Sequence, residues 1–190
     1  MNPLVRMIDL ATKAHRGQMR KYNNEPYIMH PIRVMLEVIK VSDLLLTDQI
    51  ESVVCAAVGH DLFEDTTVTY NDITTIFQNG IQIANLIQEL TNPSKEFPNL
   101  NRSLRKNIDL DHLFKVSPLA KTIKMCDRLD NLRGINDAPE SFVRKYLNES
   151  EALLVVLRDT LPSLAKVLYD ELNIQWKILG EGKLKEEEEE

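Results

Sequence analysis

The sequence feature that most constrains the fold is a run of mostly small apolar residues, 50–58 (IESVVCAAV), which leads directly into the charged stretch 59–66 (GHDLFEDT). An apolar run of this kind is typical of a buried helix. In a continuous helix His60 and Glu64 lie four residues apart, as do Asp61 and Asp65, so all four side chains share one broad face. Charge at the end of a buried helix must be compensated. We therefore expect either a bound metal cation or a solvated acidic helix end with a capping carboxylate.

Composition indicates a single globular domain. The chain has 190 residues, of which 43% are hydrophobic and 27% charged, and its net charge is −6. An acidic chain is a poor general binder of nucleic acid, so anionic ligands must meet local cations. No apolar run approaches the roughly 20 residues that cross a bilayer, and the first residues lack the apolar segment of a signal peptide. We expect a cytoplasmic protein with no membrane partner, whose Cys55 and Cys126 are core residues kept reduced.

Helical periodicity runs through the chain, and no segment shows convincing strand alternation. The first helix is expected over 3–14, and Pro31 is expected at the first position of the second, which makes His30 a helix-entry residue. The third runs from about Thr47, a plausible N-cap, to the HDLFEDT stretch. The remaining helices are expected over 71–77 with Asn71 as cap, 81–90, 101–114, from Ser117-Pro118 onward, 140–157 and 161–179.

This pattern predicts an all-α fold, a compact bundle of about eight to nine helices in one domain over residues 1–179. The charged segment 180–190 (GEGKLKEEEEE) is expected to be a disordered tail. Segment 91–100 (TNPSKEFPNL) contains two prolines, so we interpret it as a loop and a candidate lid on the substrate side.

Two groups of cations stand out in this acidic chain. Arg20 and Lys21 form a pair in a turn-rich connection, and residues 101–114 carry Arg102, Arg105, Lys106 and His112. The second group is either a cationic binding site or a solvated helix face. Further along, Arg128 and Asp130 are expected to form surface salt bridges of little energetic value.

Residues of the types that bind metals lie in three separate predicted helices. They are His30, His60, Asp61 and Asp127. Two imidazoles with two carboxylates suit a borderline or hard divalent ion such as Mn²⁺, with Fe²⁺ or Zn²⁺ as alternatives. A structural zinc site is disfavoured because the set contains no cysteine. Asn131 lies four residues after Asp127 and so shares its side of the helix.

This order of ligands resembles the signature of the HD-domain metal-dependent phosphohydrolases. Three longer segments, AHRGQMRKYNNEPYIMHP, GHDLFEDT and KMCDRLDNLR, are similar to the ppGpp hydrolase domain of the RelA/SpoT family. The short layout resembles the small stand-alone hydrolases of that family. The likeness extends from about residue 3 to residue 160, and it is weakest between residues 90 and 117.

The resemblance implies roles for individual residues. His30, His60, Asp61 and Asp127 match the family's Mn²⁺ ligands. Glu64 and Asp65 match its catalytic carboxylates, which can accept a proton from a metal-activated water. Asn131 matches an asparagine that hydrogen-bonds the nucleotide or the water.

The resemblance also implies contacts with the substrate. Arg20 matches an arginine that stacks on guanine. Lys21, Arg105 and Lys106 are the expected partners of phosphate. Tyr146 matches a nucleotide-contacting tyrosine, although the residues around it, SFVRKYL, depart from the family pattern.

The implied function is an Mn²⁺-dependent 3′-pyrophosphohydrolase that converts ppGpp to GDP and pyrophosphate. Two alternatives keep the same pocket: a metal-dependent phosphatase of NADPH or another phosphorylated nucleotide, and a nucleotide sensor without catalytic activity. In each case the partner is a small-molecule nucleotide, and the sequence leaves open whether the chain forms a homo-oligomer.

Overall fold

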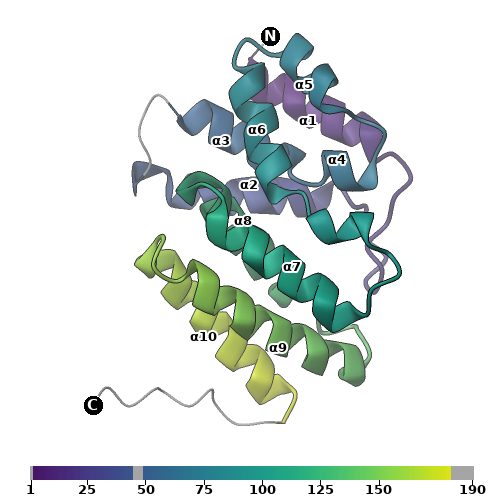
Figure 1. The fold of residues 1–190 in the computed structure, drawn as a ribbon, viewed down its shortest axis with the longest axis vertical. Helices are drawn as coiled ribbons and strands as arrows, with labels where there is room; N and C mark the ends of the chain where they lie inside the picture. The colour runs from purple at the N-terminus through teal and green to yellow at the C-terminus, as the bar shows by residue number, and fades with distance from the viewer. Residues whose placement is uncertain (1, 45–48, 181–190) are drawn as a thin grey trace.

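Helices alone build the described part of the computed structural model, which covers residues 2–44 and 49–180 (Figure 1). This range contains ten α-helices, two short 3-10 helices and no strand, and nine of the α-helices have seven or more residues. The predicted all-α bundle is confirmed. The α-helices are α1 (Pro3–Ala14), α2 (Met29–Lys40), α3 (Ile50–Gly59), α4 (Leu62–Asp65), α5 (Tyr70–Ile76), α6 (Gly80–Leu90), α7 (Arg102–Lys115), α8 (Pro118–Arg133), α9 (Glu140–Leu157) and α10 (Pro162–Ile178), and the 3-10 helices are η1 (Ser42–Leu44) and η2 (Pro93–Glu96).

Helix α8 is the central element of the bundle. Ser117 caps its N-terminus by accepting a hydrogen bond from the Ala120 N–H, and Pro118 occupies the first position, as predicted. The helix packs against α2, α3, α6, α9 and α10. Because neighbours surround it, α8 carries polar side chains into the interior, among them Asp127, Arg128 and Asp130.

The other helices form two ends around this centre. In Figure 1, α1, α3, α5 and α6 lie at one end, α9 and α10 at the other, and α2, α7 and α8 between them. The apolar core includes Cys55 and Cys126, which are free thiols with no exposed surface, so their interpretation as core residues is confirmed. Among the described helices none combines the length and the apolar character that a membrane span requires.

The helical arrangement considered for GHDLFEDT is interrupted in the structure. Helix α3 ends at Gly59, and α4 begins at Leu62, so His60 and Asp61 lie at the break. Gly59 packs so closely on Ile87 that a Cβ would lie 2.8 Å from its Cδ1 atom. Past this contact, polar interactions hold the two residues at the break: the His60 ring bonds the Ala57 carbonyl, and Asp61 accepts from a tyrosine hydroxyl. The predicted cap Thr47 lies outside the described residues.

Two other predicted helix starts also shift. Helix α5 begins at Tyr70, and its cap is Thr69, not Asn71. Thr69 is the cap because it forms a reciprocal capping box with Asp72, in which each side chain accepts a hydrogen bond from the backbone N–H of the other residue. Helix α2 begins at Met29, two residues before Pro31, which places His30 within its first turn.

Candidate metal centre

Four side chains from separate parts of the chain meet at one point in the interior. They are His30 on α2, His60 and Asp61 at the α3–α4 break, and Asp127 on α8. His30 Nε2 lies 3.2 Å from Asp127 Oδ1 and 3.8 Å from Asp61 Oδ2. His60 Nε2 lies 2.9 Å from Asp61 Oδ2 and 3.8 Å from Asp127 Oδ1. These separations are those of donor atoms that share one small cation at about 2.1 Å from each.

The hydrogen bonds of the two imidazoles fix where their lone pairs point. His30 Nδ1 lies 2.7 Å from Asp130 Oδ2, and His60 Nδ1 lies 2.9 Å from the Ala57 carbonyl oxygen. Both partners are acceptors, so each Nδ1 carries a hydrogen, and each ring turns its Nε2 toward Asp61 and Asp127. His60 Nε2 is buried and has no hydrogen-bond partner among the described residues. The two Nε2 atoms and the two carboxylates could therefore serve as ligands of one cation.

The electrostatics of the site agree with this geometry. Burial alone would lower the pKa of His60, but the carboxylates of Asp61 and Asp127 outweigh burial and raise it to about 9. Burial would raise the pKa of Asp127, but the ammonium of Lys124 and the two imidazoles hold it well below its usual range. The site therefore favours positive charge, either as a proton on an imidazole or as a bound cation. The donor set of two imidazoles and two carboxylates fits a divalent metal.

Polar neighbours hold His30 and Asp127 in position. Asp130, which orients the His30 ring, also receives Arg33 Nε at 2.6 Å, and Asn131 Nδ2 donates to Asp127 Oδ1 at 2.5 Å. A carboxylate behind a histidine ligand is a recurrent support of metal sites. The predicted surface salt bridges of Asp130 and Arg128 are wrong, because both side chains are buried. The missed signal was the three-residue spacing from Asp127 to Asp130, which places both on the inward side of α8.

Tyr27 belongs to the site as well, although the sequence pattern did not predict it. Its hydroxyl donates to Asp61 Oδ2 at 2.5 Å and lies 3.5 Å from Asp65 Oδ2, so it connects a candidate ligand to a candidate catalytic carboxylate. Burial and the nearby Asp61 raise the pKa of this phenol far above its ordinary value, so it remains a donor. Tyr27 lies three residues before His30, close to the first turn of α2, which is the spacing that could have revealed it.

Tyr27→Phe is expected to weaken divalent-cation binding by about tenfold or more, because loss of a hydrogen bond to a metal ligand typically costs 10–100-fold in affinity. The measurement is a Mn²⁺ titration followed by calorimetry. Tyr70→Phe is the matched control, since the Tyr70 hydroxyl bonds Asn85 at an exposed position on α5. Equal Mn²⁺ affinity in the wild type and Tyr27→Phe would contradict a role for Tyr27 at the metal centre.

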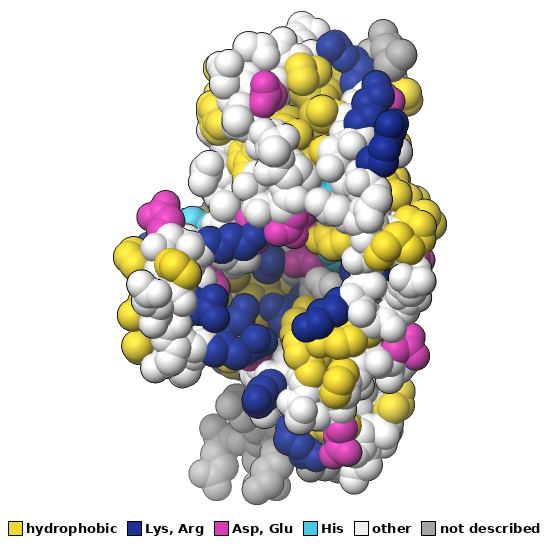
Figure 2. Space-filling view, turned by 90° about the vertical axis from the view of Figure 1, so that its right-hand side faces the viewer, with side chains coloured by type: hydrophobic (Ala, Val, Ile, Leu, Met, Phe, Trp, Pro, Cys, Tyr) yellow, Lys and Arg dark blue, Asp and Glu magenta, His cyan; other side chains and the backbone are white. Residues whose placement is uncertain are grey.

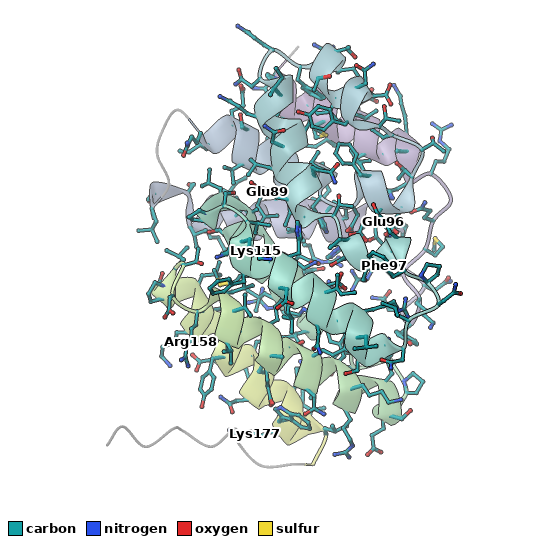
Figure 3. All side chains as sticks on the ribbon, in the orientation of Figure 1. Glu89, Glu96, Phe97, Lys115, Arg158 and Lys177 are labelled. Carbon is teal, nitrogen blue, oxygen red and sulfur yellow. The ribbon has the colours of Figure 1, made fainter. Side chains whose placement is uncertain are left out.

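The carboxylates of Glu64 and Asp65 lie just beyond Asp61 and are held by the segment 91–100. Glu64 Oε1 accepts from the Asn92 N–H at 2.5 Å and from Asn92 Nδ2 at 2.9 Å. Lys95 Nζ lies 2.8 Å from Glu64 Oε2 and 3.0 Å from Asp65 Oδ1. Part of the predicted loop is η2, which packs against α7 and whose C-terminal end is marked by Glu96 and Phe97 in Figure 3. The segment therefore contacts the carboxylate pair directly.

A cavity of about 430 Å³ opens beside the metal centre, and Lys and Arg side chains gather around a hollow on this face of the molecule (Figure 2). Three candidate ligands, His30, Asp61 and Asp127, contribute to its wall. The predicted substrate-side residues that line it are Arg20, Lys21, Lys106, Asn131 and Tyr146. Arg105, Glu64 and Asp65 do not line this cavity. Two cations that were not predicted to belong to the site, Lys124 and Arg128, do line it.

Part of the wall of this cavity is aromatic. Phe142 stacks on Tyr146 with ring centroids 5.8 Å apart, and Tyr22 lies 5.1 Å from Phe142. The guanidinium of Arg128 lies over the Tyr146 ring at 4.4 Å. A cavity that combines flat apolar faces with several cations can hold a ligand that has both an aromatic base and phosphate groups.

Comparisons with known proteins identify the family of the chain. A family model described as an HD domain matches residues 8–161. Guanosine-3′,5′-bis(diphosphate) 3′-pyrophosphohydrolase MESH1 of Homo sapiens is 32% identical over 174 residues, which cover 87% of this chain and 90% of that protein. The protein of the same name from Drosophila melanogaster is 35% identical over 129 residues, 67% of this chain and 66% of the relative.

A solved structure is similar over almost the whole length. It is described as a metazoan ortholog of SpoT that hydrolyzes ppGpp, and it matches 95% of this chain and 97% of its own with a TM-score of 0.76 and 26% identity. The family model spans most of the sequence, and relatives above 30% identity match along most of their length. The chain therefore belongs to the HD-domain family, in the group that contains the MESH1 proteins.

Proposed function

We propose that the protein is a metal-dependent 3′-pyrophosphohydrolase that converts ppGpp to GDP and pyrophosphate. The observation that carries this proposal is the pair of buried imidazoles turned toward Asp61 and Asp127, at one end of a cavity walled by cations. The names of the MESH1 relatives support the choice of substrate. The cations that line the cavity also support this substrate. They are concentrated there although the chain as a whole is acidic, and phosphate groups bind to Lys and Arg side chains.

The cation that we propose is Mn²⁺, held by His30, His60, Asp61 and Asp127, with Fe²⁺ or Zn²⁺ as the alternatives that the donor set permits. When bound, such an ion lowers the pKa of a coordinated water and polarises the phosphoryl oxygens. Asp130 and Tyr27 keep the ligand atoms in position through their hydrogen bonds to His30 and Asp61.

The cations of the cavity position the substrate. We assign Arg20 to stacking on the base, because its side chain is mostly buried beside Gly134 and its planar guanidinium suits a flat partner. Tyr146 forms the aromatic wall next to it. Lys21 and Lys106 face the phosphates, with Lys124 and Arg128. Arg105 is not retained as a phosphate contact, because it is absent from the lining of the cavity.

In the chemical step, the water oxygen forms a bond to the phosphorus attached to the 3′ oxygen of the ribose, and the bond between that phosphorus and the 3′ oxygen breaks. The 3′ oxygen leaves with a proton, which yields GDP and pyrophosphate. We assign Glu64 and Asp65 to accept the proton of the water, since they follow Asp61 by one turn. Asn131 positions Asp127 and faces the nucleotide.

The test is a product-release assay with the purified protein and added Mn²⁺. Release of pyrophosphate from ppGpp is expected, together with GDP in equal amount, and pppGpp is tested in parallel. NADPH is included as an adenine nucleotide from which the protein could release phosphate. Turnover of NADPH but not of ppGpp would replace the proposed substrate, and tight ppGpp binding without turnover would replace the enzyme with a nucleotide sensor.

A further inference from the structure

A second cavity, of about 530 Å³, lies between α7, α8 and α9. Its wall carries five cationic side chains and only two carboxylates, in a chain whose net charge is −6. The cations are Arg102, Lys106, Lys124, Arg128 and Lys145, and the carboxylates are Asp109 and Glu149. Such a concentration of positive charge in an acidic protein indicates an anionic ligand.

This second cavity adjoins the one beside the metal centre. Lys106, Lys124 and Arg128 line both. These three cations therefore form the boundary between the two cavities, where they can contact anionic groups bound on either side. Lys124 Nζ lies 2.7 Å from Asp127 Oδ2, so its charge is already shared with the metal centre.

Arg128 is the cation at this boundary whose charge is least compensated. Its side chain is buried, with 7% of the residue surface exposed. It donates to the Ser150 hydroxyl at 2.9 Å and lies over the Tyr146 ring, and neither of these partners is an anion. Its Nε is buried and has no hydrogen-bond partner among the described residues. A buried guanidinium without an anion is costly, so a bound anion here would stabilise the site.

The two carboxylates of the wall leave most of this charge uncompensated. Asp109 accepts hydrogen bonds from the Ser94 N–H and Oγ, which fixes η2 on α7. Glu149 pairs bidentately with Arg102 and lies 4.0 Å from Lys106 Nζ. Burial lowers the pKa of Lys106, as expected for an ammonium whose charge is incompletely paired.

We propose that the second cavity binds a phosphate chain that is not the one hydrolysed, namely the 5′-diphosphate of the same nucleotide. This assignment rests on the proposed function: ppGpp carries two diphosphates, and one of them occupies the metal centre. The boundary of Lys106, Lys124 and Arg128 then lies between the two chains. A separate inorganic phosphate chain has the same chemistry, and the experiment distinguishes the two sources.

The experiment compares ppGpp with guanosine 3′-diphosphate that has a free 5′ hydroxyl. Lys145 is the residue to change, because it is exposed on the second cavity and does not line the metal-side cavity. Lys145→Met is expected to raise the KM for ppGpp by about tenfold, the contribution of one charge-assisted hydrogen bond. The KM ratio between the two substrates should shrink by the same factor, and Lys145→Arg should restore it.

Glu149→Gln is expected to change the KM for ppGpp in the direction opposite to Lys145→Met. It removes the carboxylate that pairs with Arg102, so the Arg102 charge becomes available to the phosphate chain and the KM should fall. Lys115→Met is the control, since Lys115 is an exposed lysine at the C-terminal end of α7 that lines neither cavity (Figure 3). If Lys145→Met leaves the KM for ppGpp unchanged, or raises the KM of both substrates equally, the 5′-diphosphate does not bind here.

A binding measurement keeps this inference separate from the proposed function. Inorganic tripolyphosphate is titrated calorimetrically into the wild type, Lys145→Met and Lys115→Met. Binding about tenfold weaker in Lys145→Met alone is expected even if the wild type releases no pyrophosphate from any substrate. Weaker tripolyphosphate binding combined with an equal KM change for both substrates assigns the cavity to a separate phosphate chain. Identical affinities in the three proteins overturn the second site altogether.

Discussion

His60→Ala and Asp61→Ala are each expected to abolish divalent-cation binding and hydrolysis together, with activity falling by more than about a thousandfold. The reason is that each substitution removes one of four donor atoms, whereas loss of an outer hydrogen-bond partner alone already costs 10–100-fold. His60 also supplies a buried Nε2 that makes no hydrogen bond within the described residues and lies 2.9 Å from Asp61 Oδ2. A metal that binds only the folded state stabilises it by about 2.7 kcal/mol at a free concentration one hundred times its dissociation constant.

The measurement is therefore the melting temperature with and without Mn²⁺, recorded beside the rate of pyrophosphate release. The wild type should melt at a higher temperature with the ion, and the two variants should not respond. His112→Ala is the matched control, because His112 bonds the Glu89 carbonyl oxygen at 2.8 Å, at the α6–α7 contact and away from the four ligands. A His60→Ala protein that kept the full thermal response to Mn²⁺ would exclude His60 from the metal centre.

The features of the fold that follow from local periodicity were predictable. Helix α8 is an example: Ser117 and Pro118 define its start, and the four-residue spacing of Asp127 and Asn131 correctly predicted that their side chains would lie together. The convergence of His30, His60, Asp61 and Asp127 was predictable from their types and from the resemblance to a family. The exact helix boundaries at 60–61 and 69–70 were not, because side-chain hydrogen bonds and close packing decide them.

The supporting residues could not be recognised from the sequence because burial changes the meaning of a charged side chain. Asp130 and Arg128 look like ordinary surface charges, but α8 is surrounded by other helices, so one orients His30 and the other projects into the cavities. Lys95 was missed for another reason: it is exposed and lies in a segment predicted to be a loop, yet it contacts both carboxylates that follow Asp61. These contacts join residues that are far apart in the chain, so a local sequence pattern cannot predict them.

Glu64→Gln is expected to keep the metal and to lower kcat by about 10²–10⁴-fold, the usual contribution of a general base. Glutamine has nearly the same volume and can still accept the two Asn92 hydrogen bonds, but it cannot take the proton of the water. The thermal response to Mn²⁺ should match that of the wild type, and steady-state kinetics measures the loss of kcat. A variant with normal kcat would show that Glu64 is not the base.

Lys95→Met separates proton transfer from the anchoring of the segment 91–100. Lys95 contacts both Glu64 Oε2 and Asp65 Oδ1, so its removal loosens the segment but leaves both carboxylates intact. If Glu64 acts as the base, Lys95→Met should change kcat by less than about tenfold, because partly exposed ion pairs contribute about 1 kcal/mol or less. If instead the two variants lose kcat to the same extent, Glu64 serves to hold the segment, and the proton passes to Asp65. That carboxylate is the more exposed of the two, and Lys95→Met removes the cation from its Oδ1 while the Tyr27 hydroxyl stays 3.5 Å from its Oδ2, so water can reach it.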